Sequence, residues 1–230
     1  MDIPEDEPDP QGPNDLVHTI GSRFMILATC GPCVELGDHI ATCMEFDVSE
    51  TIAITDIPPT NLVTWVPRNR VPILLISLGD SCTVVFVQET GKFYYASETV
   101  ALPHNMPAGS ILLAHYTEDD GIGCRSPRVL IYDVAAWGSG TNRTQYVDVT
   151  KVNPHDRYRI LREEFDPLLK ENNNTKTVLQ WCGYLEGARQ FLNGTMPVGH
   201  DVETLLELCT ENALRPRIVT GGHLNRSCHV

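Results

Sequence analysis

The tetrapeptide CGPC at residues 30–33 is the first group in the sequence that could do chemistry. A short apolar segment precedes it and a helix could start after it, which is typical of thiol redox proteins because a helix start activates the first thiol. However, the residue before Cys30 is a threonine, and a long strand-rich region follows. We therefore interpret the two cysteines as structural thiols, and thiol redox activity through Cys30 and Cys33 remains an alternative.

A zinc site would need two ligands in addition to these two thiols. Cys43 and His39 are close in the sequence, but their spacing matches no standard zinc finger. We therefore expect no metal site and no cofactor.

The stretch TWVPRNRV, residues 64–71, has a tryptophan shortly before two arginines. An indole can stack on a base, and guanidinium groups bind phosphate as planar forks. The apolar run at 73–78 then predicts a buried strand. The pattern therefore predicts nucleotide contacts at Trp65, Arg68 and Arg70. The alternative is that the two arginines are only a solvated leader before a strand.

A third stretch, SPRVLIYDVAAWGSG at residues 126–140, combines an apolar strand with aromatic side chains. The strand is expected to end at Tyr132 and Asp133, and the glycines after Trp137 indicate a loop. Trp137 is then either a stacking platform at the edge of a pocket or a packing residue of the core.

The order of these segments resembles the nucleotidyltransferase domain of messenger-RNA capping enzymes, the guanylyltransferases. Their strand motif P-R-x-L-I-Y-D matches residues 127–133 almost letter for letter, and their helix motif with I-L-x-E-E is similar to residues 157–165. Their first motif, T-W-K-x-D-G-x-R, aligns with residues 64–71, and their third motif, L-L-D-G-E, aligns with residues 112–116. The resemblance covers roughly residues 55–170 and implies the same fold.

The groups that give these enzymes their activity are replaced here. In the family, a lysine amine attacks the α-phosphate of GTP, and Val66 occupies the position of that lysine. Arg68 and Asn69 replace an Asp-Gly pair, and Tyr116 is aligned with a glutamate of the third motif. We therefore expect a pseudoenzyme that has no catalytic residue and binds a nucleotide without reacting with it.

The cap-binding domain of snurportin, which is not catalytic, is similar at one further point. Its strand runs into D-V-x-x-W followed by a glycine, which matches residues 133–138. The resemblance implies that Trp137 stacks on a methylated guanine, whose positive charge adds a cation–π attraction. The expected ligand is a guanine nucleotide or the 5′ cap of an RNA, bound by Trp65, Arg68, Arg70, Tyr132 and Trp137.

The order of the strands and helices expected around these residues predicts an α+β fold. In this fold, an antiparallel sheet is followed by helices mainly in the C-terminal third. The expected strands are at 23–29, 51–54, 62–65, 73–78, 82–88, 93–96, 110–115 and 128–132. Turns are expected at 58–59, 79–80, 90–91 and 119–121. Helices are expected at 156–170, 177–192 and 201–212.

Charge and composition limit the organisation of the chain and its partners. The 230 residues have a net charge of −13, and residues 2–15 hold six acids and four prolines. We expect a disordered acidic tail at 1–18, one nucleotidyltransferase-like domain at 19–215 and a flexible C-terminal tail at 216–230. An acidic body disfavours duplex DNA as a partner. It suits a protein partner, so an interaction scaffold that kept the fold and lost the pocket is the alternative function.

The sequence also predicts where the protein is located. No apolar run approaches the length of about 18 residues that a membrane helix needs, and no apolar segment follows the acidic N-terminus. We therefore expect no membrane partner, and an intracellular protein of the nucleus or cytoplasm whose cysteines are reduced.

Overall fold

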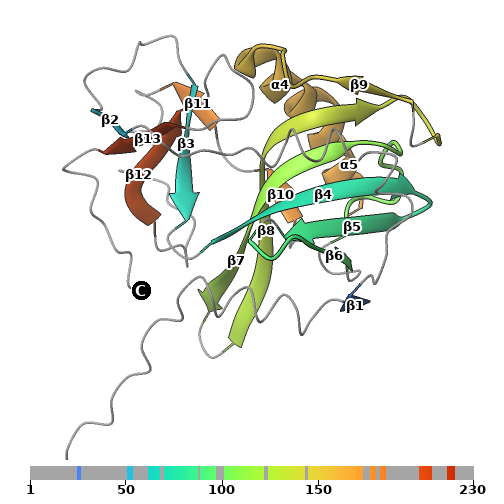
Figure 1. The fold of residues 1–230 in the computed structure, drawn as a ribbon, viewed down its shortest axis with the longest axis horizontal. Helices are drawn as coiled ribbons and strands as arrows, with labels where there is room; N and C mark the ends of the chain where they lie inside the picture. Colours follow the sequence, from blue (N-terminus) through green and yellow to red (C-terminus); the bar gives the residue numbers. More distant parts are fainter. Residues whose placement is uncertain are drawn as a thin grey trace, which may run out of the picture.

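In the residues that it describes, the computed structural model has two β-sheets and one helical segment (Figure 1). The structure describes residues 25–26, 51–53, 62–67, 70–87, 89–96, 101–121, 124–142, 145–172, 177–179, 182–184, 202–208 and 217–220. The predicted α+β class with a mostly antiparallel sheet is confirmed within these residues.

The larger sheet has eight strands, in the order β1-β6-β5-β4-β7-β8-β10, and β9 pairs with β8. The strands are β1 (Met25–Ile26), β4 (Val71–Gly79), β5 (Cys82–Val87), β6 (Lys92–Tyr95), β7 (Ile111–Gly121), β8 (Cys124–Gly138), β9 (Tyr146–Asp148) and β10 (Thr177–Leu179). All neighbours are antiparallel except β8 and β10.

The second sheet has five strands, in the order β11-β3-β12-β13-β2. They are β2 (Thr51–Ala53), β3 (Leu62–Pro67), β11 (Cys182–Tyr184), β12 (Val202–Leu208) and β13 (Arg217–Thr220). Only β2 and β13 are parallel in this sheet. Strand β13 lies at the start of the segment 216–230, for which a flexible tail was predicted.

Local sequence explains the hairpins of the larger sheet. Asp80 and Ser81, between β4 and β5, both have positive φ angles, of 49° and 64°. A two-residue turn with this geometry matches the twist of the strands that it joins. Gly91, with φ of 63°, lies in the turn between β5 and β6. Both turns were predicted from their glycines, and both predictions are confirmed.

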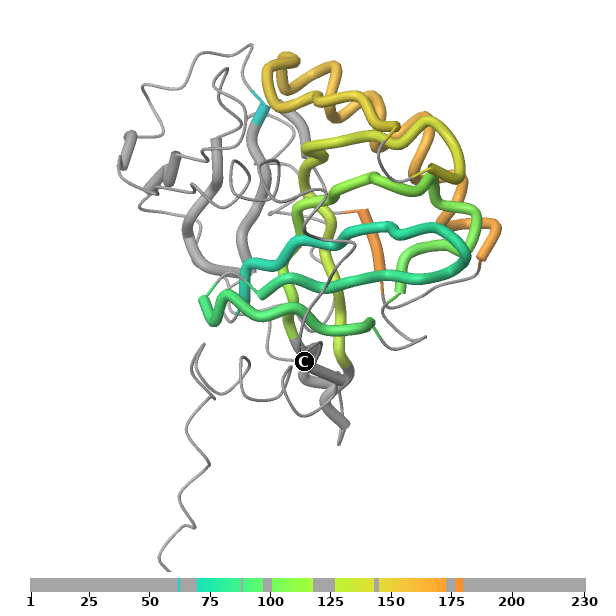
Figure 2. Tube along the Cα trace, turned by 45° about the vertical axis from the view of Figure 1, so that its right-hand side comes forward, coloured from blue at the N-terminus to red at the C-terminus, as the bar shows by residue number. Residues whose placement is uncertain are grey.

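The helical segment runs without a break through α4 (Pro154–Ile160), a π-helical turn η2 (Leu161–Phe165) and α5 (Asp166–Glu171). Asn153 caps its start, because its side-chain oxygen accepts a hydrogen bond of 3.0 Å from the Asp156 backbone N–H. Buried residues on the segment face the larger sheet, beside which the segment lies (Figure 2). The predicted helix at 156–170 is confirmed.

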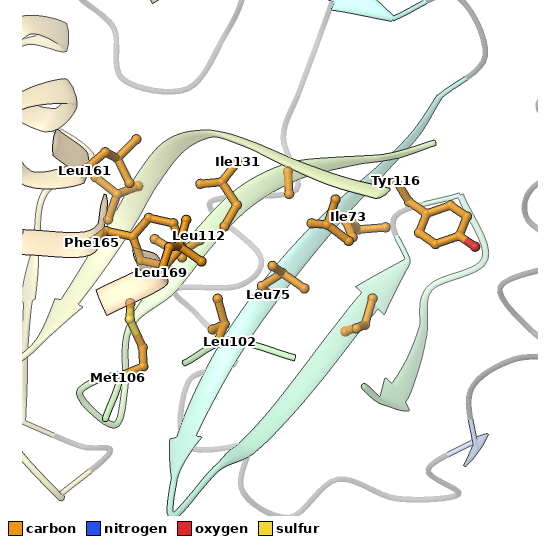
Figure 3. Close-up of a cluster of buried hydrophobic side chains, with 14 of the residues drawn as sticks. Ile73, Leu75, Leu102, Met106, Leu112, Tyr116, Ile131, Leu161, Phe165 and Leu169 are labelled. Atoms are coloured by element: carbon orange, nitrogen blue, oxygen red, sulfur yellow. The ribbon is translucent and has the colours of Figure 1, made fainter. Parts of the chain in front are cut away.

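The apolar residues of the larger sheet form one cluster on each face. The cluster on the face that the helical segment covers, called here the helix face, includes Ile73, Leu75, Leu112, Tyr116, Ile131, Val134, Leu161, Phe165 and Leu169 (Figure 3). The alternate residues form the cluster on the opposite face, which contains Leu74, Ile76, Val84, Phe86, Ile111, Leu113, Ala135 and Ala136. Figure 3 shows Tyr116 at the end of the helix-face cluster away from the helical segment.

Two of the three predicted helices are wrong in the part of the chain that the structure describes. Residues 177–179, 182–184 and 202–208 are strands, which pair with β8 and β3. The sequence of β12, VETLLEL, has an apolar spacing that also suits a helix, and pairing with two remote strands decides between the two. The turn predicted at 119–121 is also wrong, because these residues pair with 124–126 inside the β7–β8 ladder.

The acidic segment at 1–18 and the turn predicted at 58–59 lie outside the described residues. Strand β8 is longer than the predicted strand at 128–132, because it starts at Cys124 and ends at Gly138. Within the described ranges, no helix is both long and apolar enough to cross a membrane.

Gly138 is required by a close contact between the end of β8 and the connection that precedes β7. A Cβ atom at this position would lie 2.1 Å from the Ala108 carbonyl oxygen. The Gly138 N–H also donates a hydrogen bond of 2.9 Å to Ser110 Oγ in the same connection. We expect Gly138→Ala to destabilise the protein by about 3 kcal/mol, the upper end for overpacking, because backbone must move.

Gly91→Ala is the matched control for this prediction. A Cβ at Gly91 meets nothing within 4 Å, so only its positive φ of 63° opposes the substitution. Its cost should be about 1 kcal/mol. Urea unfolding of both variants measures the difference, and equal costs would show that the contact at Gly138 is not tight.

Candidate functional site

Strand β8 contains two bulges, which set the direction of its side chains. In the β7–β8 ladder, Ala114 faces Ile131 and Leu113 faces Asp133, so Tyr132 is an extra residue. A second irregularity falls between the pairs that involve Ile111 and Leu112. Bulges of this kind bend a strand and redirect a side chain, and they are frequent next to functional sites.

The carboxylate after the first bulge is held by a buried arginine of the helical segment. Arg157 donates from Nε to Asp133 Oδ1 at 2.8 Å and from NH2 to Oδ2 at 2.9 Å. Arg157 is only 1% exposed, and its NH1 donates to the Val152 carbonyl oxygen. Asp133 Oδ1 also accepts the Val134 backbone N–H at 2.8 Å. The pair therefore fixes the start of α4 to β8 at the bulge.

The ionisation of Asp133 depends on its partner. Burial raises the pKa of this carboxyl, and the Arg157 guanidinium and its hydrogen bonds act against that rise. A buried carboxylate is stabilised only while such a partner is present. Since all of these contacts are internal, Asp133 has a structural role.

Tyr132 itself lies beside a buried histidine of β7. The rings of Tyr132 and His115 are stacked, with centroids 4.5 Å apart and planes inclined by 22°. His115 is 2% exposed, whereas Tyr132 remains partly exposed. Tyr132 packs against the cluster of the face opposite the helical segment. We call this side of the sheet the Tyr132 face.

Two arginines lie on the same face, at the end of the sheet where β4 begins. Thr117 of β7 pairs directly with Arg128 of β8. Arg70 directly precedes Val71, whose partner on β7 is Tyr116. Side chains alternate between the two faces, and Val71 and Tyr116 belong to the helix face. Arg70, Thr117 and Arg128 therefore form a row across three adjacent strands on the Tyr132 face.

The members of the Tyr132 face differ in exposure. Thr117 and His115 are buried, while Arg70, Arg128 and Tyr132 are partly exposed. Each of the five residues has a partner in the structure. The partly exposed residues of the face are thus Arg70, Arg128 and Tyr132, although Nε of Arg128 is buried.

The structure brings two of the five predicted site residues, Arg70 and Tyr132, to this face. It places Trp137 elsewhere, because that residue packs against the cluster of the helix face. Trp137 also pairs with Val147 inside the ladder of β8 and β9. The strand end expected at Tyr132 and Asp133 is therefore wrong, because the strand continues to Gly138 and the loop begins only after it.

The other predicted residues lie outside the described part of the larger sheet. Trp65 lies in β3 of the smaller sheet, opposite Leu206, and its side chain is outside the described residues. Arg68 is also outside them, as are Cys30 and Cys33.

Sequence reasoning missed His115 and Arg128. The third motif was aligned so that Tyr116 took the place of the family's glutamate, but Tyr116 is fully buried on the helix face. His115, one residue earlier, lies beside Tyr132. The alternation of apolar residues at 112, 114 and 116 was the available signal, because it predicts that residue 115 points to the other face.

The chemistry of the Tyr132 face fits a planar, anionic ligand. A phenol ring with one neighbour in stacking contact offers a surface for a base, and arginines bind phosphate through paired N–H donors. Among the side chains that the structure describes, no group of three or more His, Cys, Asp or Glu residues gathers as a metal site would require.

Comparison with known proteins assigns no family to the chain. No protein-family model matches it, and no curated protein matches it either. What this face can bind therefore follows from its own side chains.

The ion pair between Asp133 and Arg157 gives a prediction about stability. We expect Asp133→Leu and Arg157→Met each to lower the free energy of unfolding by about 3–5 kcal/mol, because each leaves one buried charge without its partner. The double variant should cost much less than the sum of the two, because no buried charge is left.

The control is the exposed pair of Arg159 and Asp156, whose N–O distance is 3.0 Å. Arg159→Met should change the free energy of unfolding by less than about 1 kcal/mol. Denaturant unfolding of the four variants tests this. Additive losses in the double variant would mean that the two residues do not act as a pair.

Proposed function

We propose that the chain is a non-catalytic nucleotide-binding domain whose ligand is a guanine nucleotide or the 5′ cap of an RNA. The Tyr132 face is the observation that carries this proposal. It combines a stacked, partly exposed aromatic ring with two arginines on one side of the sheet. A nucleotide needs the same two features, a flat surface for its base and positive charge for its phosphates.

A relationship to the nucleotidyltransferase fold is part of the proposal. It rests on the two stretches that most resemble the capping enzymes, residues 127–133 and 157–165. These stretches meet in the molecule, because Asp133 of the first and Arg157 of the second form the buried bidentate pair. A shared contact between two matching motifs supports a common architecture better than either motif does alone.

The absence of transfer chemistry is the second part of the proposal. Val66 lies in β3, and the resemblance aligns it with the nucleophilic lysine of the enzymes. A hydrocarbon side chain cannot attack a phosphate, and an arginine nearby cannot replace the lysine because it stays protonated. The domain is therefore expected to hold its ligand and to leave it unchanged.

Tyr132 is the proposed base platform. Trp137, the platform that the resemblance implied, packs against the helix-face cluster on the other side of the sheet. Tyr132 has His115 on one side of its ring, at a centroid distance of 4.5 Å, and is partly exposed. A base that stacks on Tyr132 would extend this aromatic pair.

Binding measurements on variants of the two aromatic residues test the assignment. Wild-type protein should bind GTP or the methylated analogue m7GTP more tightly than ATP in calorimetric titrations. Tyr132→Leu should lower this affinity by about 1–3 kcal/mol, which is roughly 5- to 150-fold, because the base loses its aromatic surface. Trp137→Phe should leave the affinity within about twofold of the wild-type value, because it keeps an aromatic ring in the core.

Other outcomes would contradict the assignment. If Trp137→Phe loses binding and Tyr132→Leu keeps it, the base binds on the helix face and not on the Tyr132 face. If none of the three nucleotides binds the wild-type protein, the nucleotide proposal fails. An interaction scaffold with the same fold, suited by the net charge of −13 to a basic protein partner, would then be the remaining function.

A labelling experiment tests the absence of transfer. The protein is incubated with radiolabelled GTP and magnesium or manganese and then separated under denaturing conditions. We expect no label on the protein, because Val66 cannot form a phosphoramidate. A labelled band that is stable to base and labile to acid would show an active lysine and overturn the pseudoenzyme proposal.

A further inference from the structure

Arg70, Thr117 and Arg128 lie in a row at one end of the Tyr132 face, and the stacked rings of Tyr132 and His115 lie further along the strands. We infer that Arg128, together with Arg70, binds the phosphate chain of the ligand, so that the ligand is a nucleoside di- or triphosphate or a cap with its polyphosphate bridge. This inference rests on the proposed function, and it adds the ligand class, its direction on the sheet and a role for Arg128.

The spacing across the strands brings the two guanidinium groups within reach of one ligand. Arg128 and Arg70 flank Thr117, and neighbouring strands are about 4.8 Å apart, so their backbones are separated by roughly 10 Å. An arginine side chain is long enough to cover half of that gap. Two arginines can therefore meet on one phosphate or on two adjacent phosphates, with the Thr117 hydroxyl between them.

The spacing along β8 sets the direction of the ligand. Arg128 precedes Tyr132 by four residues, and at about 3.3 Å per residue the two backbones are roughly 13 Å apart. Arg128 and Tyr132 are four positions apart in β8, and this even number places both side chains on one face. Their partners agree, because Arg128 pairs with Thr117 of β7 and Tyr132 stacks on His115 of β7. A nucleoside monophosphate with its base on Tyr132 would direct one phosphate toward Arg128 but not to Arg70 on the far side of Thr117. A second and a third phosphate would cover the remaining distance.

The overall charge makes these two arginines more important. The chain has a formal charge of −13, which repels a polyphosphate at long range. Local positive charge must therefore come from residues at the ligand itself. Arg70 and Arg128 are both partly buried, which weakens solvent screening and strengthens an ion pair with phosphate.

A series of ligands with an increasing number of phosphates tests the inference. Affinities of the wild-type protein for guanosine, GMP, GDP and GTP are measured by calorimetry at one fixed ionic strength. We expect similar, weak binding of guanosine and GMP and an increase of at least tenfold from GMP to GDP or GTP. In Arg128→Gln this increase should disappear, while the affinity for guanosine should stay within about twofold of the wild-type value.

Two control variants separate a specific contact from a general effect of charge. Arg162→Gln removes an exposed positive charge from the helical segment and should leave the affinities for all four compounds unchanged. Arg128→Lys keeps the charge and loses the planar fork, so it should keep part of the increase. Thermal unfolding shows whether each variant folds. If Arg128→Gln does not fold, the increase in affinity from GMP to GTP in the wild-type protein and in Arg128→Lys still tests the role of Arg128.

The outcomes distinguish this inference from the function on which it rests. If guanosine and GTP bind equally well, or if Arg128→Gln keeps the full increase in affinity from GMP to GTP, the protein is a nucleotide-binding domain but Arg128 is not its phosphate contact. If none of the four compounds binds, the proposed function fails and the inference fails with it. A short capped RNA should bind more tightly than GTP if RNA is the natural source of the ligand, and equal affinity would indicate a free nucleotide.

Discussion

The buried ion pair between Asp133 and Arg157 is the interaction on which the arrangement of the site depends. It joins the bulge of β8 to the first turn of the helical segment through two hydrogen bonds of 2.8 and 2.9 Å. Arg157 is 1% and Asp133 is 14% exposed, so the two are costly to separate, because each alone would be a largely buried charge without its partner. The bulge at Tyr132 is therefore held in one conformation, and the helical segment is held over one face of the sheet.

The two faces of the larger sheet differ in their side chains. The helix face is filled by apolar side chains from the strands and from Leu161, Phe165 and Leu169 (Figure 3). Trp137 packs against the same cluster. The Tyr132 face has polar and aromatic side chains at the end where β4 begins. Both faces thus contain a buried apolar cluster, and the bulge places Tyr132 beside His115 at the edge of the cluster on the Tyr132 face.

Much of the larger sheet could be predicted from the sequence, because its strands and turns have strong local signals. The apolar run at 73–78, the turn at Asp80 and the helical spacing at 156–170 are examples. Strands β10 and β12 could not be predicted, because their pairing partners are distant in the sequence, as in the pair of Thr177 with Val129. Trp137 was assigned to the site because of the resemblance at residues 133–138 and because the glycines after it indicated a loop, whereas in the continuous strand it faces away from Tyr132.

The central claim is that the Tyr132 face, and not the helix face, receives a guanine nucleotide. Chemical-shift mapping of the isotope-labelled protein during a titration with GDP tests this most directly. We predict that the largest shifts occur at the Tyr132 and His115 rings and at the backbone of Arg128, and that the indole N–H of Trp137 hardly moves. Large shifts at Trp137 and the helical segment, with none on the Tyr132 face, would contradict the account.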